Sequence, residues 1–172
     1  LVRGVEDSSL GAPFKAYPID VDGHHATLVE YPFGSSPRRT DSASTPKGIA
    51  LYIHGFNDYF FQREMAEKMD SAGYAFFAVD LHGYGRSIRE GEPRSDMHFA
   101  SEFFAEIDYA VEMGWHLVKS NLEHKVYDTV RDSSNEVITR AITAIKRPPS
   151  ILVAHSQGGL IASLYMEDGR RD

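Results

Sequence analysis

A serine at position 156 stands in a sequence setting that can make it a nucleophile. Residues 150–160 read SILVAHSQGGL, a short apolar run that ends at His155 and a second apolar segment with helical spacing. This order predicts a strand, a sharp turn and a helix. A serine on such a turn exposes its Oγ above the strand end, and its crowded backbone requires small residues two positions before and after it. Ala154 and Gly158 fill these two positions.

Two further motifs follow apolar runs earlier in the chain. Residues 49–53 (IALYI) end in His54-Gly55, and residues 74–79 (YAFFAV) lead into residues 80–87 (DLHGYGRS). Taken singly, each of the three motifs also fits an ordinary turn. The glycines of residues 80–87 look like part of a dinucleotide fingerprint, but the third glycine of G-x-G-x-x-G would fall at Ile88. The pattern therefore speaks against a dinucleotide site.

Together, the motifs at three successive strand ends resemble the α/β-hydrolase superfamily, and within it the lysophospholipase and monoacylglycerol lipase group. Residues 80–87 are similar to the D-x-x-G-x-G-x-S stretch of its lipases, esterases and proline-type aminopeptidases. The usual pattern around the nucleophile is G-x-S-x-G, from which this chain departs at Ala154. The resemblance spans residues 15–166 and corresponds to the N-terminal half of a typical member.

The resemblance implies a role for each motif. Ser156 takes the nucleophile position, and the backbone N–H groups of Phe56 and Gln157 form the oxyanion hole, which stabilises the negative charge that develops during acyl transfer. Supporting positions in the elbow and the neighbouring loop are Ala154, Gly158, His54 and Gly55. The turn at residues 80–87 has a structural role beside the site.

The implied activity is hydrolysis of a carboxylic ester, lipase-like or esterase-like, through an acyl-Ser156 intermediate. A thioester or an amide remains an alternative substrate. Four aromatic residues near the expected oxyanion loop fit an acyl chain and fit core packing equally well: Phe56, Tyr59, Phe60 and Phe61. The substrate is therefore expected to be a small molecule of apolar character.

The other two members of a catalytic triad are missing from the expected place. A serine needs a histidine to take its proton and an acid to orient that histidine, and in this fold the chain order is Ser, acid, His. No histidine follows Ser156, and the fold gives no base role to His54, His82 or His155. We therefore expect the acid and the histidine to lie beyond the given chain. The alternative is a noncatalytic α/β-hydrolase relative that binds a ligand or a partner in the same cleft.

Composition narrows the remaining function classes. The chain has 172 residues, a net charge of −7 and no cysteine, which argues against a nucleic-acid partner and excludes thiolate metal ligands. The pair His24-His25 has no carboxylate at metal-ligand spacing, so we expect neither a metal nor another cofactor. No apolar run reaches the length of about 18 residues that a spanning helix needs. No signal peptide is visible, which favours a cytoplasmic location unless a leader has been removed.

The positions of these motifs depend on alternating strands and helices. Residues 15–32 carry two strand-like stretches around Asp22-Gly23, a dipeptide suited to a tight antiparallel hairpin. Between the strands at 49–53 and 74–79, apolar residues at helical spacing end at Gly73. This order predicts a parallel pair of strands with a covering helix.

The second half of the chain is predicted to be mainly helical up to the elbow. An amphipathic helix runs from Phe103 to Val118, with a break expected at Gly114, and residues 116–132 look like a polar surface excursion. A capping box at Ser133 and Glu136 opens a further helix, before the elbow strand and its helix.

The fold class is therefore α/β, with a doubly wound, mostly parallel sheet and an antiparallel N-terminal hairpin. The resemblance implies that residues 1–172 form a single, incomplete α/β-hydrolase domain. Because the sheet would end at the elbow strand, we expect self-association through its exposed edge.

Overall fold

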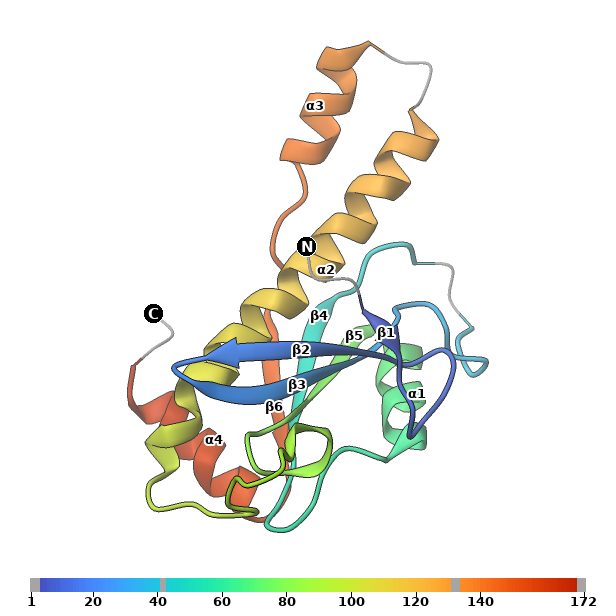
Figure 1. Cartoon of the computed structure of the whole chain (residues 1–172). Coiled ribbons are helices and arrows are strands. Elements are labelled where there is room, and N and C mark those ends of the chain that lie inside the picture. Colours follow the sequence, from blue (N-terminus) through green and yellow to red (C-terminus); the bar gives the residue numbers. More distant parts are fainter. Residues whose placement is uncertain (1–3, 41–42, 131–133, 170–172) are drawn as a thin grey trace.

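The computed structural model of the chain describes residues 4–40, 43–130 and 134–169. Its sheet has six strands in the order β1-β2-β3-β5-β4-β6. The strands are β1 (Val5–Glu6), β2 (Lys15–Val21), β3 (His24–Tyr31), β4 (Gly48–Ile53), β5 (Tyr74–Asp80) and β6 (Ser150–Ala154). The helices are α1 (Arg63–Ser71), α2 (Phe104–Thr129), α3 (Asn135–Thr143) and α4 (Gln157–Glu167). Figure 1 follows the chain through these elements.

The sheet is mixed, and its antiparallel part is larger than the sequence predicted. Strands β2 and β3 form the predicted hairpin, with Asp22 and Gly23 at φ angles of 51° and 82° in the turn. The short strand β1 adds to one side of this hairpin, and β3 pairs antiparallel with β5. Only β5, β4 and β6 are mutually parallel neighbours. These three strands are the ones that lead into the three sequence motifs, so the motifs follow neighbouring strands of the sheet.

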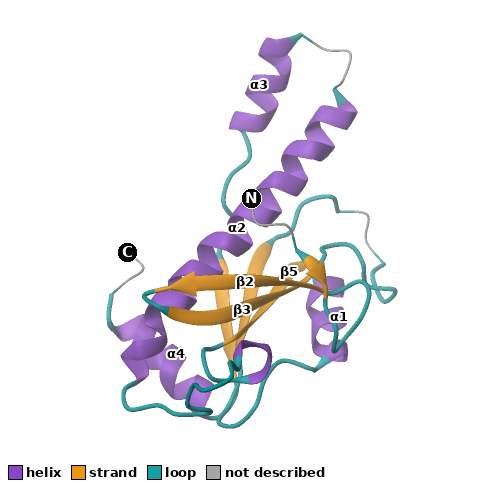
Figure 2. Ribbon diagram, viewed as in Figure 1, coloured by secondary structure: helices purple, strands orange, loops and turns teal. Residues whose placement is uncertain are grey.

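Helices cover both faces of the sheet, as Figure 2 shows. Alternate residues of β4 enter two different cores: Leu51 packs in the core beneath α2 and α4, and Tyr52 in the core beneath α1. A strand buried on both faces needs a continuous apolar run, which explains why residues 49–53 show no alternation. The expectation of a doubly wound α/β fold is confirmed.

Helix α2 contradicts two expectations. It continues through Gly114 and on to Thr129, where the sequence suggested a break and a polar surface excursion. Gly114 lies against the sheet, and a Cβ atom added there would be 3.2 Å from the ring of Phe77. The glycine thus allows a close approach between helix and sheet, which outweighs its low helix propensity. Beyond it, Leu117 and Leu122 remain buried on the same side.

The end of α2 and the whole of α3 form an arm that extends away from the sheet (Figure 1). Helix α3 packs on α2, and none of its residues is buried. The predicted capping residue Ser133 lies outside the described residues, and Ser134 is the N-cap, without a side-chain capping bond. Among the described residues, no helix is both long enough and apolar enough to cross a membrane.

Candidate active site

The turn between β6 and α4 gives Ser156 a strained backbone. Its φ and ψ angles are 51° and −120°, and it is the N-cap of α4. A non-glycine residue in such a region costs about 1–3 kcal/mol, and it persists only where its surroundings impose it. Here the His155 N–H donates to the carbonyl of Ile53 at 3.2 Å, and the Gly158 N–H donates to the carbonyl of His155 at 2.9 Å. The side of the turn that carries Ser156 is exposed.

Two glycines let the end of β4 lie directly against this turn. A Cβ atom on Gly55 would be 3.2 Å from the Cβ of Ser156, and one on Gly158 would be 2.3 Å from the carbonyl oxygen of His54. Backbone atoms leave no room for a side chain at Gly158, and a side chain at Gly55 would have to displace the turn slightly. Ala154, the small residue on the other side of the serine, pairs with Ile53 at the end of β6.

The two amides expected to form an oxyanion hole come from the segments that meet here. Phe56 follows Gly55, and Gln157 is the first residue of α4, where the helix dipole favours negative charge. In the described part of the chain, neither backbone N–H donates to a protein acceptor. The Gln157 side chain accepts a hydrogen bond from the Tyr84 hydroxyl at 3.4 Å and donates to Sδ of Met97 at 3.2 Å. Both amides are therefore available to an external acceptor.

His54 is buried beneath the site, and both of its ring nitrogens have partners. Nδ1 donates to the carbonyl of Gly55 at 2.8 Å, and Nε2 accepts the N–H of Leu81 at 3.1 Å. Burial lowers the pKa of His54 below its ordinary value, although the Gly55 carbonyl and nearby carboxylates act in the opposite direction. A neutral ring in this position joins the end of β4 to the end of β5. It has no free nitrogen with which to accept a proton from Ser156.

The other two histidines near the motifs are also placed away from a base role. Nδ1 of His82 is hydrogen-bonded to the buried carboxylate of Glu106, and the His82 ring stacks on that of His24 at a centroid distance of 4.1 Å. His155 points into an exposed region, with Nδ1 4.0 Å from the carboxylate of Asp58. Within the described residues, no group of three His, Cys, Asp or Glu side chains is arranged to hold a metal ion.

Three of the four aromatic residues expected at the mouth are exposed, and the fourth is in the core. Phe56 and Phe61 are 64% and 53% exposed, and the rings of Tyr59 and Phe61 lie 5.5 Å apart. Phe60 is fully buried, with its ring 5.6 Å from that of Tyr52. The core-packing alternative is thus correct for Phe60. The other three leave an apolar surface on the loop that follows β4.

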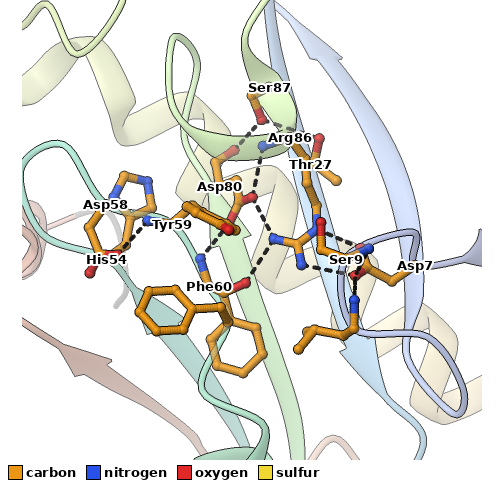
Figure 3. A network of polar contacts seen from close by, with 12 residues as sticks. Asp7, Ser9, Thr27, His54, Asp58, Tyr59, Phe60, Asp80, Arg86 and Ser87 are labelled. Atoms are coloured by element: carbon orange, nitrogen blue, oxygen red, sulfur yellow. Dashed lines mark hydrogen bonds and ion pairs between the residues drawn. The ribbon is translucent and has the colours of Figure 1, made fainter.

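A group of charged residues beside this loop was not predicted from the sequence. Asp80 and Arg86 belong to the motif at residues 80–87, and in the structure they form a buried ion pair that Asp7 joins from the N-terminal segment (Figure 3). Asp80 could have been singled out, because it is the first residue of the D-x-x-G-x-G-x-S pattern. Nothing in the sequence marked Asp7, which is 79 residues from its partner Arg86.

Comparison with known proteins links this geometry to one family. The sequence pattern of the family described as serine aminopeptidase, S33, matches residues 44–172. Among curated proteins, no sequence is significantly similar to this chain.

Several solved structures share the fold. A carboxyl esterase from Bacillus coagulans, solved with glycerol, superposes with a TM-score of 0.56 at 16% identity, over 88% of this chain and 39% of its own. Est1E from Butyrivibrio proteoclasticus, solved with ferulic acid, superposes with a TM-score of 0.52 at 18% identity, over 90% of this chain and 48% of its own. A soluble variant of monoglyceride lipase from Saccharomyces cerevisiae, solved with a substrate analogue, superposes with a TM-score of 0.51 at 21% identity, over 89% of this chain and 39% of its own. The chain thus spans less than half the length of each of these structures.

Proposed function

Because the chain belongs to the serine aminopeptidase S33 family of α/β-hydrolases, we propose that it hydrolyses carboxylic esters with Ser156 as the nucleophile. The observation that carries the proposal is the backbone of Ser156. A φ angle of 51° at a strand-to-helix turn, pressed against Gly55, is the geometry that presents a serine Oγ at the end of a sheet. A turn with no chemical role would have no reason to retain a strained serine there, since a glycine would relieve the strain.

The reaction would proceed in two acyl transfers. Oγ of Ser156 attacks the ester carbonyl as its proton passes to a base, and the oxyanion that forms accepts hydrogen bonds from the Phe56 and Gln157 amides. Collapse of this intermediate breaks the C–O bond, and the departing alcohol takes the proton from the base. Water then attacks the acyl-Ser156 ester and gives a proton to the same base. When the bond between the acyl carbon and Oγ breaks, the base returns that proton to Oγ, and the carboxylic acid and free serine are released.

The proposal needs a histidine base that the described chain does not offer. No histidine follows Ser156 in the sequence, and His54 and His82 are already engaged by other groups. We propose that the base and its orienting acid are supplied from outside this chain. The same observation favours a second candidate function, a noncatalytic relative that binds an apolar ligand at the site.

The substrate class follows from the surface around the turn and from the relatives. The exposed rings of Phe56, Tyr59 and Phe61 would lie beside an acyl group bound at the amides of Phe56 and Gln157. The solved structures that share the fold include an esterase and a monoglyceride lipase. We therefore propose an ester with an apolar acyl group, and we keep amides as the competing substrate because of the family's description.

Covalent labelling tests the nucleophile. In the longest natural form of the protein that contains this sequence, a fluorophosphonate should label Ser156, and p-nitrophenyl butyrate should be hydrolysed. Ser156→Ala should abolish both signals. Ser163→Ala is the matched control, since Ser163 is an exposed serine of the same helix and should retain both. Labelling without turnover of esters or aminoacyl anilides would favour the binding protein, and labelling that survives Ser156→Ala would reject the assignment.

A further inference from the structure

A buried ion network lies beside Tyr59 and Phe60, in the loop that follows β4 (Figure 3). Nη1 of Arg86 is 2.8 Å from Oδ2 of Asp80, and Nε and Nη2 bond the two carboxylate oxygens of Asp7 at 2.5 and 3.0 Å. Burial alone would raise the pKa of Asp7, but hydrogen bonds from Arg86 and from the Leu10 amide hold it below its ordinary value. The same contacts raise the pKa of Arg86, so the Asp7 carboxylate and the Arg86 guanidinium are both charged at neutral pH.

The network binds both polar backbone atoms of Phe60. Oδ1 of Asp80 accepts the Phe60 N–H at 2.9 Å, and Nη1 of Arg86 donates to the Phe60 carbonyl at 2.8 Å. The ring of Phe60 is fully buried, 5.2 Å from that of Phe76. A residue held by its N–H, its carbonyl and its ring has no freedom to rotate. Phe60 is thus a fixed point four positions after Phe56.

The loop between these two residues cannot hold its shape alone. Asn57 has a φ of 50°, in the left-handed region, and the Phe56 ring before it is exposed. A strained residue in an exposed loop needs neighbours that impose its conformation. The Ser95 hydroxyl donates to Oδ1 of Asn57 at 3.3 Å, and the turn at Gly85 lies against the loop, since a Cβ atom on Gly85 would be 2.3 Å from the Cβ of Tyr59. The loop is therefore packed against the same turn that presents Arg86.

We propose that Arg86 and Asp80 are positioning residues for the oxyanion-binding amide of Phe56. They act by holding the backbone of Phe60 through hydrogen bonds to its N–H and its carbonyl. The inference rests on the proposed function, since it assigns the Phe56 amide to a developing oxyanion. Asp7 is the third member of the network, and its carboxylate pairs with the other edge of the Arg86 guanidinium. It also ties the loop to the N-terminal segment, where its Oδ1 accepts the Ser9 and Leu10 amides.

The structure contains a matched pair for the test. Arg39 and Asp70 form a second buried arginine–aspartate pair, with Nη1 and Oδ1 3.3 Å apart. Asp70 lies near the C-terminal end of α1, whereas the loop after β4 leads into the N-terminal end of the same helix. Lysine in place of either arginine keeps the charge but loses the planar set of donors. Arg39→Lys thus controls for the loss of a guanidinium paired with a buried aspartate, at a place where the pair does not contact Phe60.

Two readouts separate positioning from stability. In the longest natural form of the protein, hydrogen exchange of the amides at 56–61 should be at least 10-fold faster in Arg86→Lys than in Arg39→Lys, with exchange in β4 and β5 equal in both. In the longest natural form of the protein, Arg86→Lys should lower kcat on p-nitrophenyl butyrate by about 10-fold to 100-fold, the range of a displaced catalytic contact. Its KM should stay within about twofold of the Arg39→Lys value. Arg86→Met should give the larger loss, and Arg86→Lys serves where that variant does not fold.

The outcomes distinguish this inference from the proposed function. Equal exchange at 56–61 in the two lysine variants, or equal kcat, would overturn the positioning role while Ser156-dependent turnover still stood. Turnover that does not depend on Ser156 would overturn the proposed function and with it any positioning for an oxyanion. Faster loop exchange together with a loss confined to kcat supports the inference.

Discussion

Two adjacent glycines at the start of α4 should respond in opposite directions to the same substitution. Gly158 and Gly159 both lie in the first turn of the helix. A Cβ atom on Gly159 meets nothing within 4 Å, whereas one on Gly158 would be 2.3 Å from the His54 carbonyl oxygen and 2.5 Å from that of Ile53. Both obstacles are backbone atoms at the end of a central strand, so they cannot swing aside.

The expected difference in the free energy of unfolding follows from two effects, of which the first acts at both glycines and the second only at Gly158. Gly→Ala restricts the unfolded chain and stabilises a protein by about 0.4–1 kcal/mol where the folded backbone accepts alanine. That gain applies at both positions and cancels in their difference. The remaining term is overpacking at Gly158, which costs about 1–3 kcal/mol. Gly159→Ala should therefore raise the free energy of unfolding, and Gly158→Ala should lie about 1–3 kcal/mol below it.

Urea unfolding measures this difference directly. Trp115, the single tryptophan, lies in α2 and reports on the core, and far-ultraviolet circular dichroism gives a second probe. With a slope of about 2 kcal/mol per molar urea, the two midpoints should differ by about 0.5–1.5 M. Midpoints that agree within experimental error would refute the claim that the elbow rests directly on the end of β4. A more stable Gly158→Ala would do so as well.

Three further perturbations test other parts of the site and its support. In the longest natural form of the protein, Phe56→Pro removes the proposed oxyanion donor and should lower kcat by about 10²-fold, whereas Phe56→Ala should retain most of it; equal losses in ester hydrolysis assays would point to packing of the ring instead. Because the pKa of His54 is lowered in the folded state, only the unfolded chain binds its proton just below pH 6.5, and stability falls as the pH drops through that value by up to about 1.4 kcal/mol per unit. The dependence measured by urea titration between pH 7 and 5 should be weaker in His54→Gln, and an unchanged dependence would contradict the assignment. The Tyr17 hydroxyl donates to the buried carboxylate of Glu30 at 2.6 Å, so Tyr17→Phe should destabilise the protein by about 1–3 kcal/mol in thermal or urea unfolding. No change would mean that water replaces the hydroxyl.

Local patterns in the sequence were sufficient to predict the parts of the fold that depend on neighbouring residues. Asp22-Gly23 forms the predicted hairpin turn because the required positive φ angles are a property of those two residues. The strand, turn and helix around Ser156 were predicted for the same reason. Their signals lie within a few residues of each other and need no partner elsewhere in the chain.

The features that the sequence did not reveal depend on distant contacts. Gly114 suggested a break in α2, and only the ring of Phe77 beneath it explains why the helix continues. The same holds for Arg86, whose partner Asp7 lies 79 residues away, and for His54, which accepts a hydrogen bond from an amide 27 residues away. Such pairings arise from the strand order of the sheet, which no local pattern specifies.

The arm formed by α3 and the end of α2 should unfold separately from the rest of the molecule. With no buried residue in α3, the arm contributes little to the cooperative unit formed by the sheet and its covering helices. Segments of this kind open through sub-global fluctuations, at a small fraction of the free energy that unfolds the core. Opening the arm leaves the hydrogen bonds between β4, β5 and β6 in place. The strands that lead into the site thus stay paired when the arm opens.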